Sequence, residues 1–169
     1  MKRIVLVFVL VFSVFVTGCD IGKVQQPPEE PAGMEGYVTD IEENRILVVS
    51  IETEDFSDRG GVEEFYNAIW FSNVSDGIKA GDFVKVWFDA VAESYPGQSK
   101  AIHVEVVQEQ KPEGANLSKS EALNKALRSH KKGGYAVRSI LYDQETDKWN
   151  IRLKAVMGEK EYDIDIEDK

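Results

Sequence analysis

The chain has 169 residues, 43% hydrophobic and 10% aromatic, which is enough for one or two small domains with apolar cores and excludes disorder throughout. Its 30 acidic residues outnumber 20 basic ones, and the formal charge of −10 argues against nucleic acid as a partner, because an acidic surface repels phosphate. The single cysteine excludes an internal disulfide and a cysteine-rich metal cluster.

The first 18 residues are typical of a signal peptide. Lys2 and Arg3 precede an apolar run over 4–16 that is too short to span a bilayer comfortably. The run leads into V-T-G-C at positions 16–19, which resembles the bacterial lipobox. This resemblance implies cleavage before Cys19, a lipid on its sulfur, and a mature protein anchored to the cell membrane and facing outside the cytoplasm. An ordinary secreted protein with an accidental cysteine is the alternative.

Residues 19–33 contain the lipidated cysteine and a polar, Pro-rich stretch that predicts an extended tether. In polyproline geometry, at about 3.1 Å per residue, the stretch 20–33 reaches up to roughly 40 Å from the lipid. We therefore expect the folded part to begin near residue 34.

Residues 34–108 predict a first domain made of short strands. Five runs are rich in Val, Ile and aromatic residues: Glu35–Ile41, Arg45–Ile51, Ala68–Val74, Phe83–Val91 and Lys100–Val107. Five strands of this length favour a small OB-like barrel, with an SH3-like barrel or a small sandwich as alternatives.

Strand alternation suggests a ligand-binding face on this domain. Period 2 places Trp70, Trp87 and His103 on the outer side of their strands, where aromatic rings can stack on a ligand. The predicted turn Ser94–Gln98 borders the same face, so Tyr95 and Gln98 complete the candidate ligand-binding set. The competing interpretation is that the tryptophans pack against the second domain or the long loop over 52–67, and that Pro96-Gly97 forms a type II turn without further role.

Five spaced motifs follow one another in this region: G-Y-V at 36–38, R-I-L-V-V at 45–49, Y-N-A-I-W at 66–70, G-D at 81–82 with V-K-V-W-F at 84–88, and S-Y-P-G-Q at 94–98. Together they resemble the YobA-like family of uncharacterised bacillus lipoproteins. The resemblance covers residues 34–107 and implies a small β domain of unknown function in a Gram-positive envelope lipoprotein, with no catalytic residue to carry over.

Residues 117–169 predict a second domain of one helix and a three-stranded antiparallel sheet, which makes the chain mainly β and α+β overall. Ser118 and Glu121 have the spacing of a capping box at the helix start. Strands follow over Tyr135–Tyr142, Lys148–Met157 and Lys160–Glu167. A two-residue Gly158-Glu159 turn would place Leu153 opposite Ile164 and Lys154 opposite Asp163. The helix opening S-K-S-E-A-L at 118–123 weakly resembles PepSY-type envelope domains, which implies protease inhibition or local regulation.

The residues do not point to an enzyme. The two histidines, His103 and His130, lie in different predicted domains without a spaced third ligand, and we expect no catalytic residue, metal or cofactor. We therefore expect a non-catalytic module that binds an envelope ligand or a partner protein. The alternative function is a regulator or inhibitor of a membrane-associated enzyme or protease that acts through the C-terminal domain.

Overall fold

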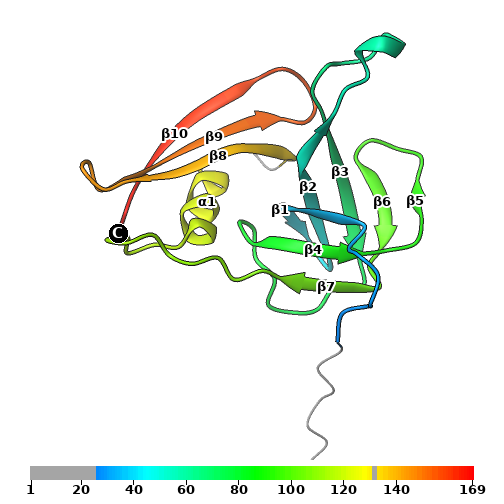
Figure 1. Cartoon of the computed structure of the whole chain (residues 1–169), viewed down its shortest axis with the longest axis horizontal. Helices are drawn as coiled ribbons and strands as arrows, with labels where there is room; N and C mark the ends of the chain where they lie inside the picture. The colour runs from blue at the N-terminus through cyan, green and yellow to red at the C-terminus, as the bar shows by residue number, and fades with distance from the viewer. Residues whose placement is uncertain (1–25, 131–132) are drawn as a thin grey trace, which may run out of the picture.

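A computed structural model describes residues 26–130 and 133–169 (Figure 1). The predicted signal peptide and the predicted lipidation site Cys19 lie outside the described residues. Within the two described ranges, no helix has the length and apolar character needed to cross a membrane.

The N-terminal half forms a seven-stranded mixed sheet, which agrees with the expected β class. The strand order is β5-β6-β3-β2-β1-β4-β7, and β3 and β6 run parallel. The strands are β1 (Met34–Glu42), β2 (Arg45–Glu54), β3 (Phe65–Ser72), β4 (Phe83–Trp87), β5 (Val91–Ala92), β6 (Gly97–Lys100) and β7 (His103–Val106).

Seven strands replace the five predicted because two of the runs are divided. The fourth run ends at Trp87, and a separate two-residue strand, β5, pairs with β6. The fifth run starts earlier and is split at Ala101 and Ile102, whose amides donate to the carbonyls of Ser72 (2.9 Å) and Trp87 (2.8 Å). The segment thus passes from β3 to β4. The two edge strands, β5 and β7, do not pair with each other within the described residues, so the sheet is not a closed barrel.

Alternation along the strands builds the core of this sheet. Val84 and Val86 are fully buried on the inner side of β4, as the period-2 pattern predicts, and Phe71 of β3 packs into the same cluster. Gly36 lies where β1 crosses β2 so closely that a Cβ atom would be 2.1 Å from the Val49 carbonyl oxygen. Only glycine fits there.

The C-terminal half contains α1 (Lys119–Arg128) and a second sheet of β8 (Tyr135–Asp143), β9 (Lys148–Ala155) and β10 (Glu161–Glu167) in the order β10-β9-β8. The capping box is confirmed: the Glu121 amide donates to the Ser118 hydroxyl (3.2 Å), and the Ser118 amide donates to the Glu121 carboxylate (2.7 Å). Leu123 and Leu127 of the helix pack on the apolar side of this sheet.

The predicted register of the last hairpin is wrong by two residues. Ile164 pairs with Ile151, and Asp163 pairs with Arg152 at 2.8 Å, because five residues (156–160) connect the strands where a two-residue turn was predicted. A shift of two leaves the same side chains on each face. The apolar pattern therefore fits both registers and could not distinguish them.

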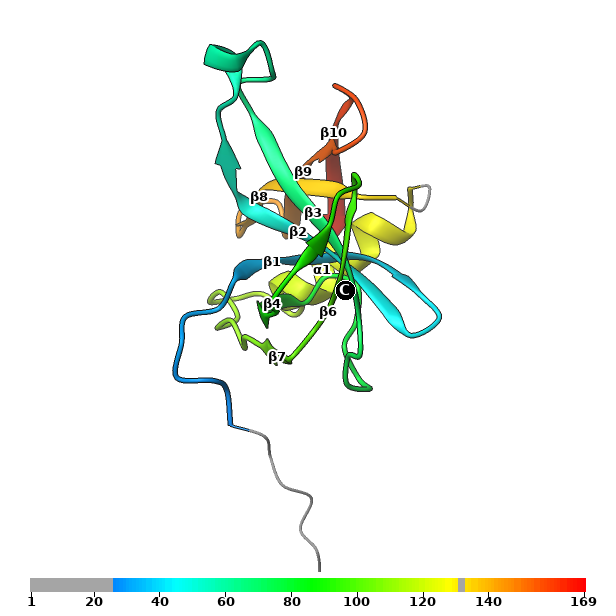
Figure 2. The same cartoon turned by 90° about the vertical axis from the view of Figure 1, so that its right-hand side faces the viewer.

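The two sheets pack together without an intervening gap. Leu47, Val49 and Ala68 on the outer side of β2 and β3 share a buried cluster with Ala136 of β8. Figures 1 and 2 show the second sheet seated above the β1–β3 region. The polar stretch 109–116 thus connects two sheets that share a core.

Two projections rise from the same end of the molecule. One is the extended β2–β3 connection over residues 52–65, which carries the short 3-10 helix η1 (Ser57–Arg59); we call it the β2–β3 arm. The other is the β9–β10 turn over 156–160. Residues 26–33 leave the body at the opposite end (Figures 1 and 2).

Candidate functional site

The five predicted ligand-binding residues do not come together on one platform. Trp87 is only 8% exposed, which corrects its predicted outward position: its indole N–H donates to the Glu30 carbonyl (2.7 Å), and its ring meets His103 edge-on at 5.2 Å. The tryptophan therefore holds the end of the predicted tether against the sheet.

Trp70 lies elsewhere, beside Gln98 in the parallel β3–β6 pairing. Its ring is half-buried against the cluster shared with Ala136, and the Arg45 guanidinium lies 5.1 Å from the ring centroid. Packing against the C-terminal sheet, the alternative interpretation of the tryptophans, thus describes Trp70 well. Gln98 is exposed.

Tyr95 is the predicted residue that reaches a cavity. It lies in a cleft of about 640 Å³ between the β2–β3 arm and the β9–β10 turn, which we call the arm cleft. The remaining lining residues were not singled out from the sequence: Val62, Glu63, Glu64, Phe65, Tyr66, Lys154, Ala155, Val156, Gly158 and Glu159. The Tyr95–Pro96 peptide is cis and Gly97 does not have a positive φ, so the predicted type II turn is wrong.

One wall of the arm cleft is aromatic. The Tyr95 ring lies 5.1 Å from the Phe65 ring, centroid to centroid, and the Tyr95 hydroxyl donates to the Tyr66 carbonyl (2.9 Å). Burial raises the pKa of Tyr95, so the hydroxyl stays protonated at neutral pH. These bonds hold the loop before β6 against the base of the arm.

A charged group joins the two sides of the cleft. The Glu64 carboxylate accepts hydrogen bonds from Lys154 (2.6 Å) and the Tyr66 hydroxyl (3.0 Å), and lies 2.9 Å from the Arg138 guanidinium. The hydrogen bond from Lys154 lowers the pKa of Glu64, and partial burial opposes this only in part. The Lys154 ammonium also lies 5.9 Å from the Tyr66 ring centroid.

Apolar side chains stand uncovered at the mouth of the cleft. Val62 on the arm is 56% exposed and Tyr95 is 37% exposed. On the opposite side the turn contributes Val156, which is half-buried. The arrangement can hold an apolar group by contact and can position it through nearby charges.

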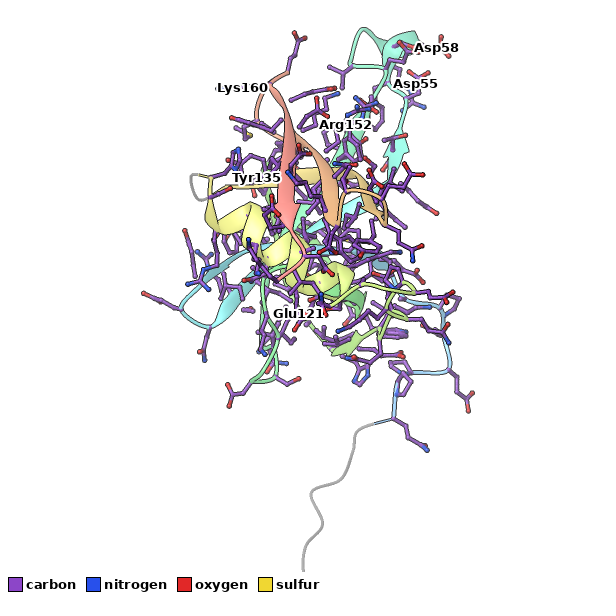
Figure 3. The ribbon with its side chains drawn as sticks, turned by 90° about the vertical axis from the view of Figure 1, so that its left-hand side faces the viewer. Asp55, Asp58, Glu121, Tyr135, Arg152 and Lys160 are labelled. Atoms are coloured by element: carbon purple, nitrogen blue, oxygen red, sulfur yellow. The ribbon has the colours of Figure 1, made fainter. Side chains whose placement is uncertain are left out.

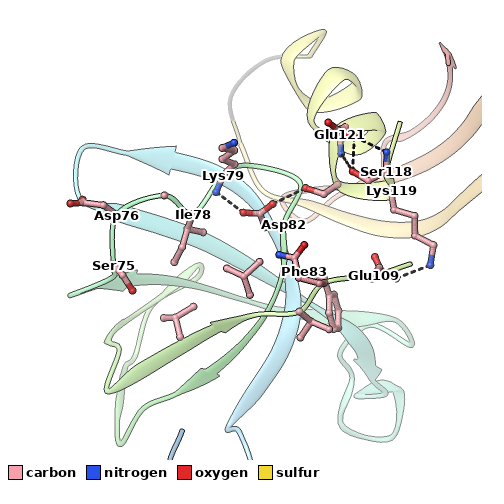
Figure 4. A pocket seen from close by; sticks show the side chains of 16 residues that line it. Ser75, Asp76, Ile78, Lys79, Asp82, Phe83, Glu109, Ser118, Lys119 and Glu121 are labelled. Atoms are coloured by element: carbon pink, nitrogen blue, oxygen red, sulfur yellow. Dashed lines mark hydrogen bonds and ion pairs between the residues drawn. The ribbon is translucent and has the colours of Figure 1, made fainter. Parts of the chain in front are cut away.

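A second hollow of about 500 Å³ lies where the first sheet meets the start of α1 (Figure 4). Asp82 accepts from the Lys79 amide (2.8 Å) and the Ser120 hydroxyl (2.6 Å), and Lys119 pairs with Glu109 at 2.7 Å. These polar groups are engaged in joining the loop, the 109–116 stretch and the helix. We therefore assign this hollow to the junction between the two sheets.

Within residues 26–130 and 133–169, no three His, Cys, Asp or Glu side chains gather closely enough to hold a metal ion. Neither histidine lies in the arm cleft.

Comparison with known proteins gives one family match. Residues 35–108, less than half of the chain, match the family described as "Protein of unknown function (DUF3221)". Searches of curated proteins and of solved structures give no match. The matched residues contain the whole seven-stranded sheet except Met34, and thus one wall of the arm cleft.

Proposed function

We propose that this protein is a membrane-anchored, extracytoplasmic lipoprotein that binds a cell-envelope ligand or a partner protein without catalysing a reaction. The arm cleft is the binding site. The observation that carries the proposal is the position of this opening, lined by the exposed Val62 and Tyr95 and by Val156 of the turn, at the end of the molecule opposite residues 26–33. A tether that leads from those residues to the membrane leaves the cleft accessible.

An OB-like interpretation of the first sheet supports a binding role. The segment Gly97–Val106 pairs with β3 in its first part and with β4 in its second, as the last strand of a partly open OB barrel does. In such a barrel, the loop between the fourth and fifth strands borders the ligand-binding face, and Tyr95 lies in the corresponding loop before β6. The C-terminal sheet supplies the second wall of the cleft.

The anchor is tested in cells with the Cys19→Ser variant. We expect the wild-type chain to incorporate a labelled fatty acid and the variant to incorporate none, because the variant lacks the sulfur that would carry the lipid. Absence of label from the wild-type chain, or equal label in Cys19→Ser, would contradict the anchor.

The binding site is tested by photocrosslinking in intact cells. A photoreactive phenylalanine replaces Val62 in the cleft, and in a matched protein it replaces Leu141, which is 63% exposed on the open face of the C-terminal sheet. A discrete adduct at position 62 alone supports the arm cleft. An adduct at position 141 alone favours the alternative regulator that acts through the C-terminal part.

A further inference from the structure

The arm cleft differs from a general apolar pocket in the charges at its mouth. We propose that it binds an extended segment of a partner protein in which an apolar side chain is flanked by basic residues. This inference rests on the proposed function and specifies its ligand.

The apolar side chain has a defined place to bind. Val62 and Phe65 from the arm, Tyr95 from the loop before β6, and Val156 from the opposite turn line a cavity large enough for more than one side chain. Met157 lies in that same turn, with an unbranched side chain that adapts to different apolar partners. Burial of these exposed groups on binding supplies the favourable free energy.

The charge expected on the ligand follows from which charged residues of the cleft already have an ion-pair partner. Lys154, the cation that lines the cleft, is paired with Glu64. Glu63 on the arm and Glu159 on the turn are exposed and form no ion pair with any residue that the structure describes. The uncompensated charge at the arm rim is therefore negative, whereas on the turn Lys160 follows Glu159 in the chain and offsets its charge. The acidic rim favours a cationic ligand and disfavours an anionic polymer.

The tip of the β2–β3 arm is also acidic. Asp55 and Asp58 stand there beside a single cation, Arg59, and Lys160 lies in the β9–β10 turn (Figure 3). The arm is thus more acidic than the turn. Basic residues of a bound segment are expected on the arm side of the cleft.

The position of the cleft favours a protein partner over a lipid surface. Residues 26–33 leave the body at the far end, so the membrane to which the predicted tether leads lies away from the cleft. A basic segment must then belong to a molecule that approaches from outside.

Binding is measured by fluorescence anisotropy with the full lipidated chain in nanodiscs of neutral lipid. The probes are three labelled octapeptides that alternate lysine with leucine, lysine with serine, and glutamate with leucine. The variants are Tyr95→Ala, the double variant Glu63→Gln/Glu159→Gln, and the matched double variant Glu113→Gln/Glu145→Gln, which removes two exposed acids far from the cleft.

We expect the lysine–leucine peptide to bind tightest. Its Kd should rise about tenfold in Tyr95→Ala, because an anchoring aromatic ring is lost, and roughly three- to tenfold in Glu63→Gln/Glu159→Gln. The matched double variant should bind within about twofold of wild type, because its two removed charges lie beyond the screening length from the cleft.

Three results would each overturn the inference: equal binding of the lysine–serine peptide, equal binding of the glutamate–leucine peptide, or no effect of the cleft variants on the lysine–leucine peptide. Absence of binding by all three probes also overturns it. The proposed function fails separately, when the photoreactive residue at position 62 yields no adduct in cells.

Discussion

Lys154 of the C-terminal sheet lies 2.6 Å from Glu64 of the β2–β3 arm, 90 residues away in the sequence. This pair, with Arg138 on the same carboxylate, fastens the second sheet to the projection that forms one wall of the arm cleft. The cleft therefore depends on both parts of the chain, although the family match covers only the first.

Replacing Glu64 with Gln should loosen this connection. The variant loses the charge that Lys154 and Arg138 share, and we expect a loss of about 1 kcal/mol in the free energy of unfolding at pH 7 in urea denaturation. Because the folded-state pKa of Glu64 is lowered, its contribution is present above the ordinary carboxyl pKa and lost as pH falls through the folded value. The difference between wild type and variant should thus shrink towards pH 3. The control is Glu63→Gln, whose carboxylate lacks an ion pair among the described residues; an equal effect in both variants would contradict the role of the pair.

Asp168 should be the most sensitive acidic residue of the C-terminal part. Its buried carboxylate accepts from the Trp149 indole (2.9 Å), the Leu117 amide (2.8 Å) and the Asn116 amide. Burial alone would raise the pKa of Asp168, but these hydrogen bonds together lower it. We expect Asp168→Asn to lower the Tm at pH 7 and to alter the near-UV signal of Trp149. Asp163→Asn, at an exposed pair with Arg152, should change the Tm little; a similar loss in both would show that the buried network is unimportant.

Alanine variants of two glycines near the junction of the first sheet with α1 distinguish the cost of backbone strain from the cost of a steric clash. Gly77 and Gly81 both have positive φ, of 95° and 98°, but a Cβ at Gly77 meets no atom within 4 Å, whereas one at Gly81 would lie 2.3 Å from the Ser120 carbonyl oxygen. Gly77→Ala should cost about 1–2 kcal/mol from backbone strain alone. Gly81→Ala should cost clearly more in thermal or urea unfolding, because α1 must move. Equal losses of stability in the two variants would mean that α1 moves away from the added Cβ atom without a cost in free energy.

Trp87→Phe should release the segment before β1. The variant keeps an aromatic ring but loses the indole N–H bonded to the Glu30 carbonyl, and we expect loss of this hydrogen bond to cost roughly 1 kcal/mol. Cleavage after Glu29 by a glutamate-specific protease should become faster than in wild type. Trp70→Phe, which leaves this bond intact, should be cut at the wild-type rate, and faster cleavage there as well would argue against a specific hold by Trp87.

Local patterns predicted the elements better than they predicted the site. The capping box at Ser118 and the buried positions Val84 and Val86 follow from spacing within one element, which neighbouring residues determine. The hairpin register and the split between β6 and β7 depend on pairing across the sheet, and period 2 is unchanged by a shift of two.

The arm cleft shows the limit most clearly. Tyr95 could be proposed from its turn, but Val62, Tyr66 and Val156 become a site only when segments 90 residues apart meet. Isolated apolar residues within the otherwise charged stretch 52–67 were the one available signal. The burial of Trp87 was hidden for a similar reason, since its partner, Glu30, lies in a stretch that has the composition of a tether.

The hydrogen bond between Trp87 and Glu30 also determines how mechanical force on the N-terminal segment would be transmitted to the fold. Tension along the tether meets first the Glu30–Trp87 hydrogen bond and then the bond between the Gly33 amide and the Val86 carbonyl (3.0 Å), both on β4, before it reaches β1. With Glu30 held, the free part of the predicted tether would be residues 20–29, which reach at most about 30 Å in polyproline geometry. Force from the proposed anchor would thus enter through β4 and then β1, and the β2–β3 arm at the far end would carry none of it.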